Sequence, residues 1–137
     1  MSEQENVQTV KDLYAAFDRG DIQAILDPLT EDVDWGYDNV ANDEVPWYGI
    51  SKGPEAVRDD FFSPLAEEVD IQVFDRKEFI ASGNHVAVTY NGEYTLKKNS
   101  KKVVQQGMHF WTFDDNGKIV RYRGFEDTAA VLAAWRG

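Results

Sequence analysis

One histidine and two carboxylates in the last third of the chain have the side chains that proton transfer requires. His109 precedes the dipeptide Asn116-Gly117, and Glu126 and Asp127 follow it. Asn-Gly is a strong signal for a two-residue hairpin turn, because both residues tolerate positive φ. Pairing through this turn places His109 opposite Gly124, which would leave space beside the imidazole, with Glu126 diagonally across. Because a carboxylate orients an imidazole and raises its basicity, we expect His109 to be an acid/base partnered by Glu126 or Asp127.

Each of these three residues also has a purely structural interpretation. His109 is equally well explained as a core histidine whose ring is satisfied by Tyr90 or Gln105. Glu126 would then be the solvated end of a strand. Asp127 directly precedes an alanine-rich stretch and suits the N-cap of a helix. Sequence alone leaves both interpretations open.

A second predicted hairpin, with a lysine-rich tip at 97–102, shares the strand that carries His109. Pairing through that tip places Tyr90 beside His109 and Tyr94 beside Gln105. Both turns gather aromatic side chains on one face, because strand side chains alternate. An aromatic face with few polar groups is typical of a small-molecule pocket. The residues that we expect to bind a substrate are Tyr14, Trp35, Tyr37, Trp47, Tyr90, Tyr94, Gln105, Trp111 and Tyr122.

Hydrophobic periodicity predicts the elements that position these side chains. Helices are predicted over 5–19, 22–29, 53–68 and 128–136. Strands are predicted over 31–38, 69–80, 85–96 and 103–113, with a last strand ending before residue 127. Pro64 should kink or end its helix. The stretch 38–53 is predicted to be a loop whose Trp47 and Tyr48 fold back over the protein.

Helices followed by a bent antiparallel sheet form an α+β arrangement. No linker or repeat divides the chain, so we expect a single domain over 1–137. The outer face of the sheet is predicted to carry Thr89, Asn91, Met108, Phe110, Thr112, Arg121, Arg123 and Phe125. That face is too apolar for free solvation, which predicts a homodimer through it. Asp34 and Asp38 point away from the pocket by parity and are expected to be mainly solvated.

Composition excludes several classes of function. With 137 residues, 42% hydrophobic and 13% aromatic, the chain is globular. A net charge of -11 repels phosphate backbones, so nucleic acid is not expected as a partner. The chain has no cysteine, which excludes disulfides and thiolate metal sites. An acidic N-terminus without a signal-like core and the lack of a long apolar run predict no membrane association and a cytoplasmic location.

The sequence also lacks the motifs of metal and cofactor sites. It contains no His-Glu-x-x-His, no calcium-binding loop and no glycine-rich phosphate loop. We therefore expect neither a metal nor a cofactor.

Three stretches together resemble a known family. They are AAFDRGDIQAILDPLTEDVDW, YGISKGPEAVRDDFF and MHFWTFDDNGKIVRYRGFEDTAAVLAAW, and they span nearly the whole chain. In this order they are similar to the nuclear transport factor 2-like superfamily, and within it to the SnoaL-like group. The resemblance implies a cone-shaped α+β barrel in which a bent sheet wraps around helices and encloses one pocket. It also implies a homodimer through the sheet.

The family includes ketosteroid isomerases, polyketide cyclases, scytalone dehydratase, limonene epoxide hydrolase and non-catalytic domains. The isomerases use an aspartate base, a tyrosine and a protonated aspartate, and these positions fall on Tyr37, Leu13 and His109 here. None of the three is retained. The Asp-Arg-Asp arrangement of the epoxide hydrolases is not supported either, because Arg121 and Arg123 are predicted to face outward, unless a bulge in the last strand reverses this. The cyclases carry an acidic residue near the end of the last strand, as Glu126 or Asp127 would.

The sequence thus predicts a small enzyme that acts without a cofactor on a small apolar organic molecule bearing a carbonyl or hydroxyl. Isomerisation, cyclisation and dehydration are the expected reaction types. A non-catalytic binding or accessory domain with the same pocket is the first alternative. A protein-interaction domain, whose pocket its own side chains would fill, is the second.

Overall fold

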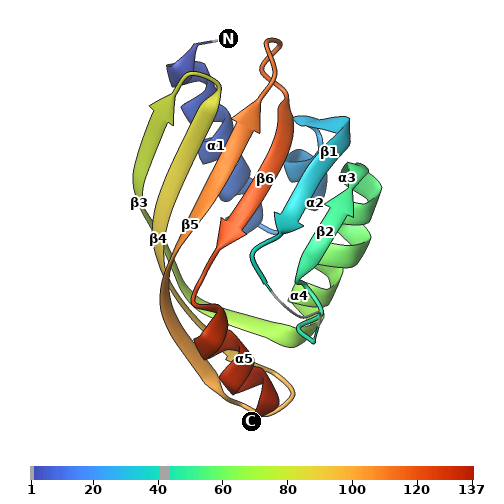
Figure 1. Ribbon diagram of the computed structural model, residues 1–137, viewed down its shortest axis with the longest axis vertical. Helices are drawn as coiled ribbons and strands as arrows, with labels where there is room; N and C mark the ends of the chain where they lie inside the picture. The colour runs from blue at the N-terminus through green and yellow to red at the C-terminus, as the bar shows by residue number, and fades with distance from the viewer. Residues whose placement is uncertain (1, 41–43) are drawn as a thin grey trace.

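The computed structural model describes residues 2–40 and 44–137. Helices open and close the chain, and a six-stranded sheet lies between them (Figure 1). The elements are α1 (Glu3–Asp18), α2 (Ile22–Leu26), β1 (Leu29–Tyr37), β2 (Gly49–Lys52), α3 (Gly53–Ala56), the π-helical turn η1 (Val57–Phe62), α4 (Ser63–Glu68), β3 (Val69–Ser82), β4 (His85–Leu96), β5 (Lys102–Phe113), β6 (Ile119–Phe125) and α5 (Thr128–Arg136). In the described part of the chain, no helix has the length and apolar character needed to cross a membrane.

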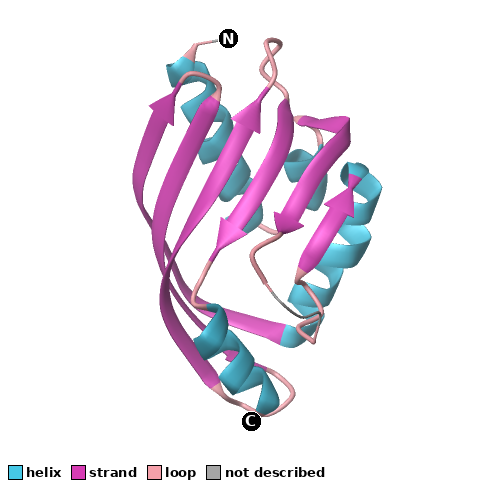
Figure 2. Ribbon diagram, viewed as in Figure 1, coloured by secondary structure: helices cyan, strands magenta, loops and turns pink. Residues whose placement is uncertain are grey.

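The strands form one bent sheet in the order β2-β1-β6-β5-β4-β3. All neighbouring strands are antiparallel except β1 and β6, which run parallel. The first helices and the segment from α3 to α4 lie behind the sheet as drawn, and α5 lies at its lower end (Figure 2). The sheet curves around the helices without closing, so the expected α+β cone is confirmed.

The N-terminal helices begin at residues that satisfy their free backbone N–H groups. Ser2 and Glu5 form a capping box at the start of α1. The carboxylate of Asp21 accepts a hydrogen bond from the backbone nitrogen of Ala24 at 3.1 Å and caps α2, as its position predicted. Gly20, at φ 74°, lets the chain turn between the two helices. These caps fix the direction from which α1 presents Tyr14 to the sheet.

The predicted hairpin at Asn116-Gly117 exists, but its turn differs from the expectation. Of these two residues, only Gly117 has positive φ, at 78°. Asp114 accepts hydrogen bonds through its side chain from the backbone nitrogens of Asn116 and Lys118, both at 2.9 Å. The longer loop creates a bulge, so Ile119 rather than Val120 pairs with Phe113. Beyond the bulge the pairing of His109 with Gly124 is as predicted.

The second hairpin is offset from its predicted register by two residues. Tyr90 pairs with Gly107 rather than His109, and Tyr94 pairs with Val103 rather than Gln105. An offset of two preserves the face of every side chain, because the strand period is two. The predicted assignment of side chains to the inner face is therefore correct, although the predicted register is wrong.

The helical segment after Gly53 runs to Glu68, past Pro64. Proline removes a backbone donor and crowds the carbonyl four residues earlier, which predicts a helix end. Here the turn before Pro64 is the wider π-helix η1, which accommodates the ring without ending the helix. The widened turn places Phe61 and Phe62 toward the core, where both are buried.

The stretch from Asp38 to Gly53, predicted as a loop, contains the edge strand β2. It pairs with β1, with Gly36 opposite Ile50 and Tyr37 opposite Gly49, and a Cβ on Gly36 would overlap the carbonyl oxygen of Gly49. The prediction that this loop folds back over the protein is confirmed, since the side chain of Trp47 is only 3% exposed. Residues 41–43 of this stretch lie outside the described residues.

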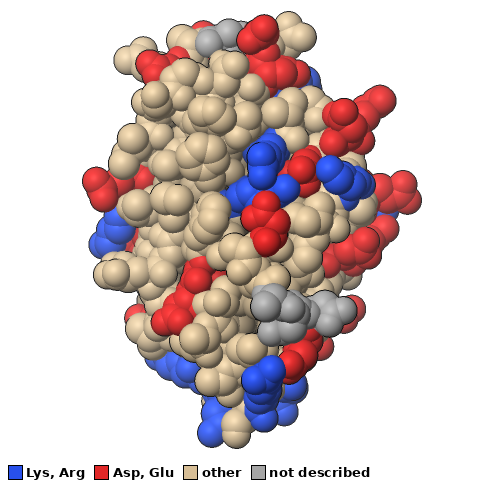
Figure 3. All heavy atoms as spheres, in the orientation of Figure 1, with Lys and Arg blue, Asp and Glu red and all other residues tan. Residues whose placement is uncertain are grey.

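A mixed cluster of basic and acidic side chains lies near the middle of the outer face of the sheet, and uncharged surface adjoins it on the left (Figure 3). Arg123 is buried there, with Nη2 2.9 Å from Asp34 Oδ2 and Nε 2.8 Å from Asp38 Oδ2. The two aspartates, expected to be mainly solvated, are thus ion-pair partners. Hydrogen bonding to Arg123 holds the pKa of both carboxyls below the usual range. The Asp-Arg-Asp arrangement faces away from the inner face, so the bulge does not reverse the predicted orientation.

Candidate functional site

A cavity of about 120 Å³ lies between the inner face of the sheet and the helices. An apolar cavity of roughly 150 Å³ holds benzene, so this space is slightly smaller than a cavity that holds one six-membered ring. The pocket is therefore not filled by its own side chains, contrary to the expectation for a protein-interaction domain. Every predicted site residue except Asp127 lines it: Tyr14, Trp35, Tyr37, Trp47, Tyr90, Tyr94, Gln105, His109, Trp111, Tyr122 and Glu126.

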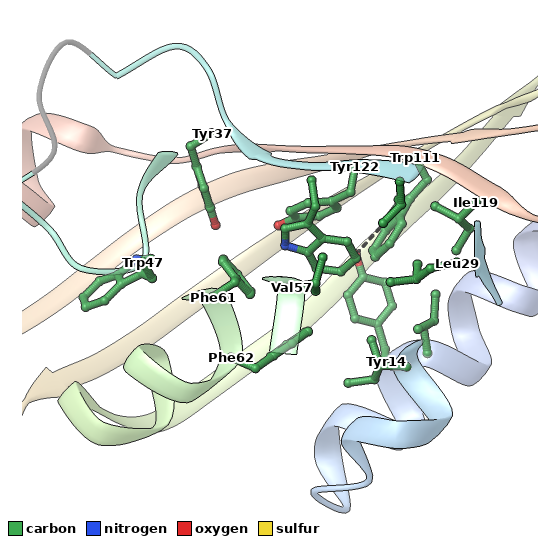
Figure 4. Packing of buried hydrophobic residues seen from close by; sticks show 14 of the residues in the cluster. Tyr14, Leu29, Tyr37, Trp47, Val57, Phe61, Phe62, Trp111, Ile119 and Tyr122 are labelled. Carbon is green, nitrogen blue, oxygen red and sulfur yellow. Dashed lines mark hydrogen bonds between the residues drawn. The ribbon is translucent and has the colours of Figure 1, made fainter. Parts of the chain in front are cut away.

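His109 is held by a helix side chain. Its Nδ1 lies 2.7 Å from the hydroxyl of Tyr14, which α1 supplies. Trp111 donates its Nε1–H to the same hydroxyl at 3.3 Å (Figure 4). The orienting partner is therefore Tyr14, rather than the predicted Glu126 or Asp127, or the alternatives Tyr90 and Gln105.

Arg76 of β3 adds a positive charge near this group. Its guanidinium carbon lies 5.0 Å from the ring centre of Tyr14 and 4.8 Å from that of Phe74. Asp18 of α1 forms an ion pair with it. Burial, with a further contribution from the Arg76 charge, lowers the pKa of His109 to about 3. The imidazole is therefore neutral near pH 7.

Glu126 supplies the acid group of the cavity. The residue is half-buried, but its Oε2 is shielded from solvent and has no hydrogen-bond partner among the described residues. Burial raises the pKa of Glu126 to about 7, and nearby Tyr48 and Gln105 oppose that rise. A carboxyl with this pKa is available both as an acid and as a base at neutral pH.

Tyrosine hydroxyls surround the carboxyl of Glu126. The hydroxyls of Tyr48 and Tyr94 are both buried, and that of Tyr94 has no hydrogen-bond partner in the part of the chain that the structure describes. Burial and then the charge of Glu126 raise the pKa of both hydroxyls, and hydrogen bonding with Glu126 adds to the shift at Tyr48, so both keep their protons. Buried polar atoms are normally hydrogen-bonded, so the Tyr94 hydroxyl near this carboxyl indicates a place for a polar ligand atom or water.

Asp127 has the structural role that its position suggested. Its carboxylate accepts a hydrogen bond from the backbone nitrogen of Ala130 at 3.0 Å and caps α5. Its backbone N–H donates to Gln105 Oε1 at 3.0 Å. Asp127 thus fixes the start of α5 and, through Gln105, the strand end beside Glu126.

Two glycines opposite the site make room for aromatic rings. A Cβ on Gly124 would overlap the ring of Tyr37, and one on Gly107 would overlap the ring of Tyr90. The space expected beside His109 at Gly124 is therefore occupied by Tyr37. Glycine within a strand commonly marks such a close approach.

Sequence reasoning missed Arg76, Tyr48 and Phe74 as neighbours of the site. A bulge between Arg76 and Glu78 breaks the alternation of β3, so the pattern could not assign its face. Tyr48 was noted only as a loop aromatic. Among the described residues, no group of three or more histidine, aspartate or glutamate side chains is arranged to hold a metal ion.

A family model for the SnoaL-like domain matches residues 10–122. The chain belongs to the SnoaL-like family. This membership agrees with the bent sheet and the enclosed cavity, and it places the chain in the nuclear transport factor 2-like superfamily. No functionally curated protein matches it.

Solved structures similar to this SnoaL-like protein cover its whole length. One is a nuclear transport factor 2-like protein of unknown function from Burkholderia pseudomallei, 26% identical over 100% of both chains, with a TM-score of 0.86. Another, from Burkholderia xenovorans, is 30% identical over 98% of each chain, with a TM-score of 0.85. TerC, co-crystallised with polyporic acid, is 23% identical over 97% of this chain and 99% of that one, with a TM-score of 0.83. At that identity the likeness shows the fold alone.

Proposed function

We propose that this SnoaL-like protein binds a compact, mostly apolar molecule bearing a carbonyl or hydroxyl, and that Glu126 moves a proton on it without a cofactor. The observation that carries this proposal is the carboxyl of Glu126. It lines an aromatic cavity, its Oε2 has no partner among the described residues, and burial raises its pKa to about 7. Groups with such environments cluster at catalytic sites.

Proton transfer at a carbon next to a carbonyl suits this arrangement. The ionised carboxylate of Glu126 takes a proton from that carbon, and the C–H electron pair moves into the substrate to give an enolate. The protonated acid returns the proton to another carbon in an isomerisation. In a cyclisation the enolate carbon bonds to a second carbonyl carbon, and Glu126 gives its proton to the new alkoxide. This assignment replaces His109 as the acid/base, because its Nδ1 is engaged by Tyr14 and burial keeps the ring neutral.

A binding or accessory domain without chemistry is the second candidate. The buried hydroxyl of Tyr94, which has no partner among the described residues, supports ligand binding whether or not a reaction follows. TerC, which has a similar structure, was co-crystallised with polyporic acid, and this supports a small organic ligand for the present protein. Native mass spectrometry of the purified protein, followed by denaturing extraction, would identify a bound molecule under either candidate.

Hydrogen–deuterium exchange of cyclopentanone, an apolar ketone with a single small ring, separates the two candidates. We expect the wild-type protein to accelerate exchange at the carbons beside the carbonyl in D2O, followed by proton NMR. Glu126→Gln should reduce the acceleration by about a hundredfold or more, because general base catalysis contributes that much. Glu67→Gln is the matched control, since it makes the same substitution at an exposed residue of α4 that does not line the cavity. Equal exchange with wild type and Glu126→Gln would exclude the proposed role of Glu126.

A further inference from the structure

We infer that Gln105 is a positioning residue for Glu126: the backbone N–H of Asp127 holds the side-chain amide of Gln105 so that its NH2 group faces the Glu126 carboxyl and favours the ionised form. The inference rests on the proposed function, because Glu126 can act as a base only when it is ionised. It deepens that function by naming the group that keeps part of this buried carboxyl ionised at neutral pH. Gln105 then acts through Glu126 rather than on the substrate.

The direction of the Gln105 amide follows from a backbone group. The backbone nitrogen of Asp127 lies 3.0 Å from this amide, and a backbone N–H can only donate. The amide atom that it meets is therefore the carbonyl oxygen Oε1, which leaves both hydrogens of the NH2 group free for another acceptor. Gln105 and Glu126 both line the cavity, and hydrogen bonding by Gln105 lowers the pKa of Glu126. A carboxylate only accepts, so the NH2 group is the part of Gln105 that serves it.

The backbone of Asp127 is held in place by the helix that follows it. Asp127 is the N-cap of α5, and its carboxylate accepts a hydrogen bond from the first turn of that helix. The helix is itself anchored, since Val131 is fully buried and the side chain of Asn99 donates to the backbone oxygen of Ala134 at 2.8 Å. Gln105 is 8% exposed, so little water competes for its amide. The amide is therefore oriented before any ligand enters the cavity.

The other groups around Glu126 make this donor necessary. Burial raises the pKa of Glu126 and the charge of Asp127 raises it further, whereas Tyr48 and Gln105 lower it by hydrogen bonding. Burial, with a contribution from the charge of Glu126, raises the pKa of the surrounding tyrosines, so they keep their protons near neutral pH. These tyrosines are Tyr37, Tyr48, Tyr90, Tyr94 and Tyr122. The amide of Gln105 carries no charge and does not titrate, so it offers its hydrogens wherever Glu126 changes form.

The pKa of Glu126 can be measured without turnover, by carbon-13 NMR of side-chain carboxyls in protein labelled at glutamate, with Glu126→Gln to assign the signal. Gln105→Met keeps the length of the side chain and removes the amide. We expect it to raise the pKa of Glu126 by about 1, because a hydrogen bond to a charged group is worth about that much. The pH at which cyclopentanone exchange reaches half its maximum rate should rise with it. Gln4→Met, at an exposed residue of α1 outside the cavity, is the control and should change neither value.

A second pair of variants tests the backbone N–H. Asp127→Pro removes it, and the φ of Asp127, -76°, is one that proline adopts. Asp127→Ala is the matched control, because it also loses the carboxylate and the helix cap but keeps the N–H. We expect a higher pKa of Glu126 in Asp127→Pro than in Asp127→Ala, since the released amide can turn away from the carboxyl. The difference should disappear when Gln105→Met is added to both.

An unchanged or lower pKa of Glu126 in Gln105→Met would overturn the inference, and this result does not depend on whether Asp127→Pro folds. Equal pKa values in Asp127→Pro and Asp127→Ala, or a difference that persists with Gln105→Met, would overturn the part assigned to the N–H. The predicted pKa changes without any exchange of cyclopentanone would refute the proposed reaction and support the role of Gln105. Exchange that Glu126→Gln abolishes, with a pKa that Gln105→Met leaves unchanged, would do the reverse.

Discussion

His109 and Glu126 show how one cavity shifts two titratable side chains in opposite directions. Burial disfavours the charged form of each, so it lowers the pKa of the imidazole to about 3 and raises that of the carboxyl to about 7. The imidazole is thereby restricted to its neutral form at physiological pH. The carboxyl can exist in both forms. Glu126, the proposed proton-transfer group, is therefore the one of the two that titrates near neutrality.

The raised pKa of Glu126 predicts that the free energy of unfolding depends on pH. Below about pH 4.5, the ordinary value, both the folded and the unfolded chain hold this proton. As the pH rises to about 7, the unfolded chain loses it first, so the free energy of unfolding falls through this window. Glu126→Gln should remove that fall. The difference in free energy of unfolding between this variant and wild type should therefore increase, in favour of the variant, by up to about 3 kcal/mol between low pH and pH 8.

Urea denaturation of both proteins across this pH range measures the difference. Glu67→Gln, an exposed residue of α4, is the control and should follow the wild-type curve. Because other carboxyls also titrate, the informative quantity is the difference between variant and wild type. Parallel curves for wild type and Glu126→Gln would contradict a raised pKa.

At the scale of the strands, glycines make room for the rings that form the cavity wall. Gly124→Ala places a Cβ against the ring of Tyr37, and this overpacking should lower the free energy of unfolding by about 1–3 kcal/mol. Gly92→Ala is the graded control, since its Cβ would meet Tyr90 Cε2 at 3.3 Å, an overlap that a small shift relieves. Equal denaturation midpoints for the two variants would argue against close packing at Gly124.

Strand faces were predictable from the sequence, whereas the strand register was predicted correctly for the last hairpin beyond its bulge and wrongly for the one before it. The faces depend on alternation, which an offset of two residues leaves intact, so the aromatic lining was found despite the wrong pairing of Tyr90. Bulges after Thr112 and after Arg76 leave no clear mark on the pattern. The partner of His109 was also unpredictable, because Tyr14 lies 95 residues away and only the packing of α1 on the sheet brings it there.

At the scale of the whole molecule, the outer sheet face remains the predicted dimer interface. It carries half-exposed Ala87, Met108, Phe110 and Phe125, with Ile80 55% exposed beside them. We expect light scattering at micromolar concentration to give twice the chain mass of 15.6 kDa. Phe110→Glu should shift the protein toward the monomer, because a carboxylate cannot be buried in an apolar contact without a partner.

Gln8→Glu adds the same charge on the exposed side of α1 and is the control for that experiment. It should leave the measured mass unchanged. A wild-type protein with the mass of one chain at these concentrations would refute the predicted dimer. The cavity does not depend on this outcome, since its lining comes from one chain.

The parallel pairing of β1 with β6 joins the two halves of the chain, since Asp34 lies beside Arg121 and Trp35 beside Tyr122. Contacts between residues so distant along the chain form slowly, because the intervening segment must first be ordered. During synthesis, Trp35 leaves the ribosome long before its partner strand exists. The wall of the cavity is therefore completed only after β6 has been synthesised.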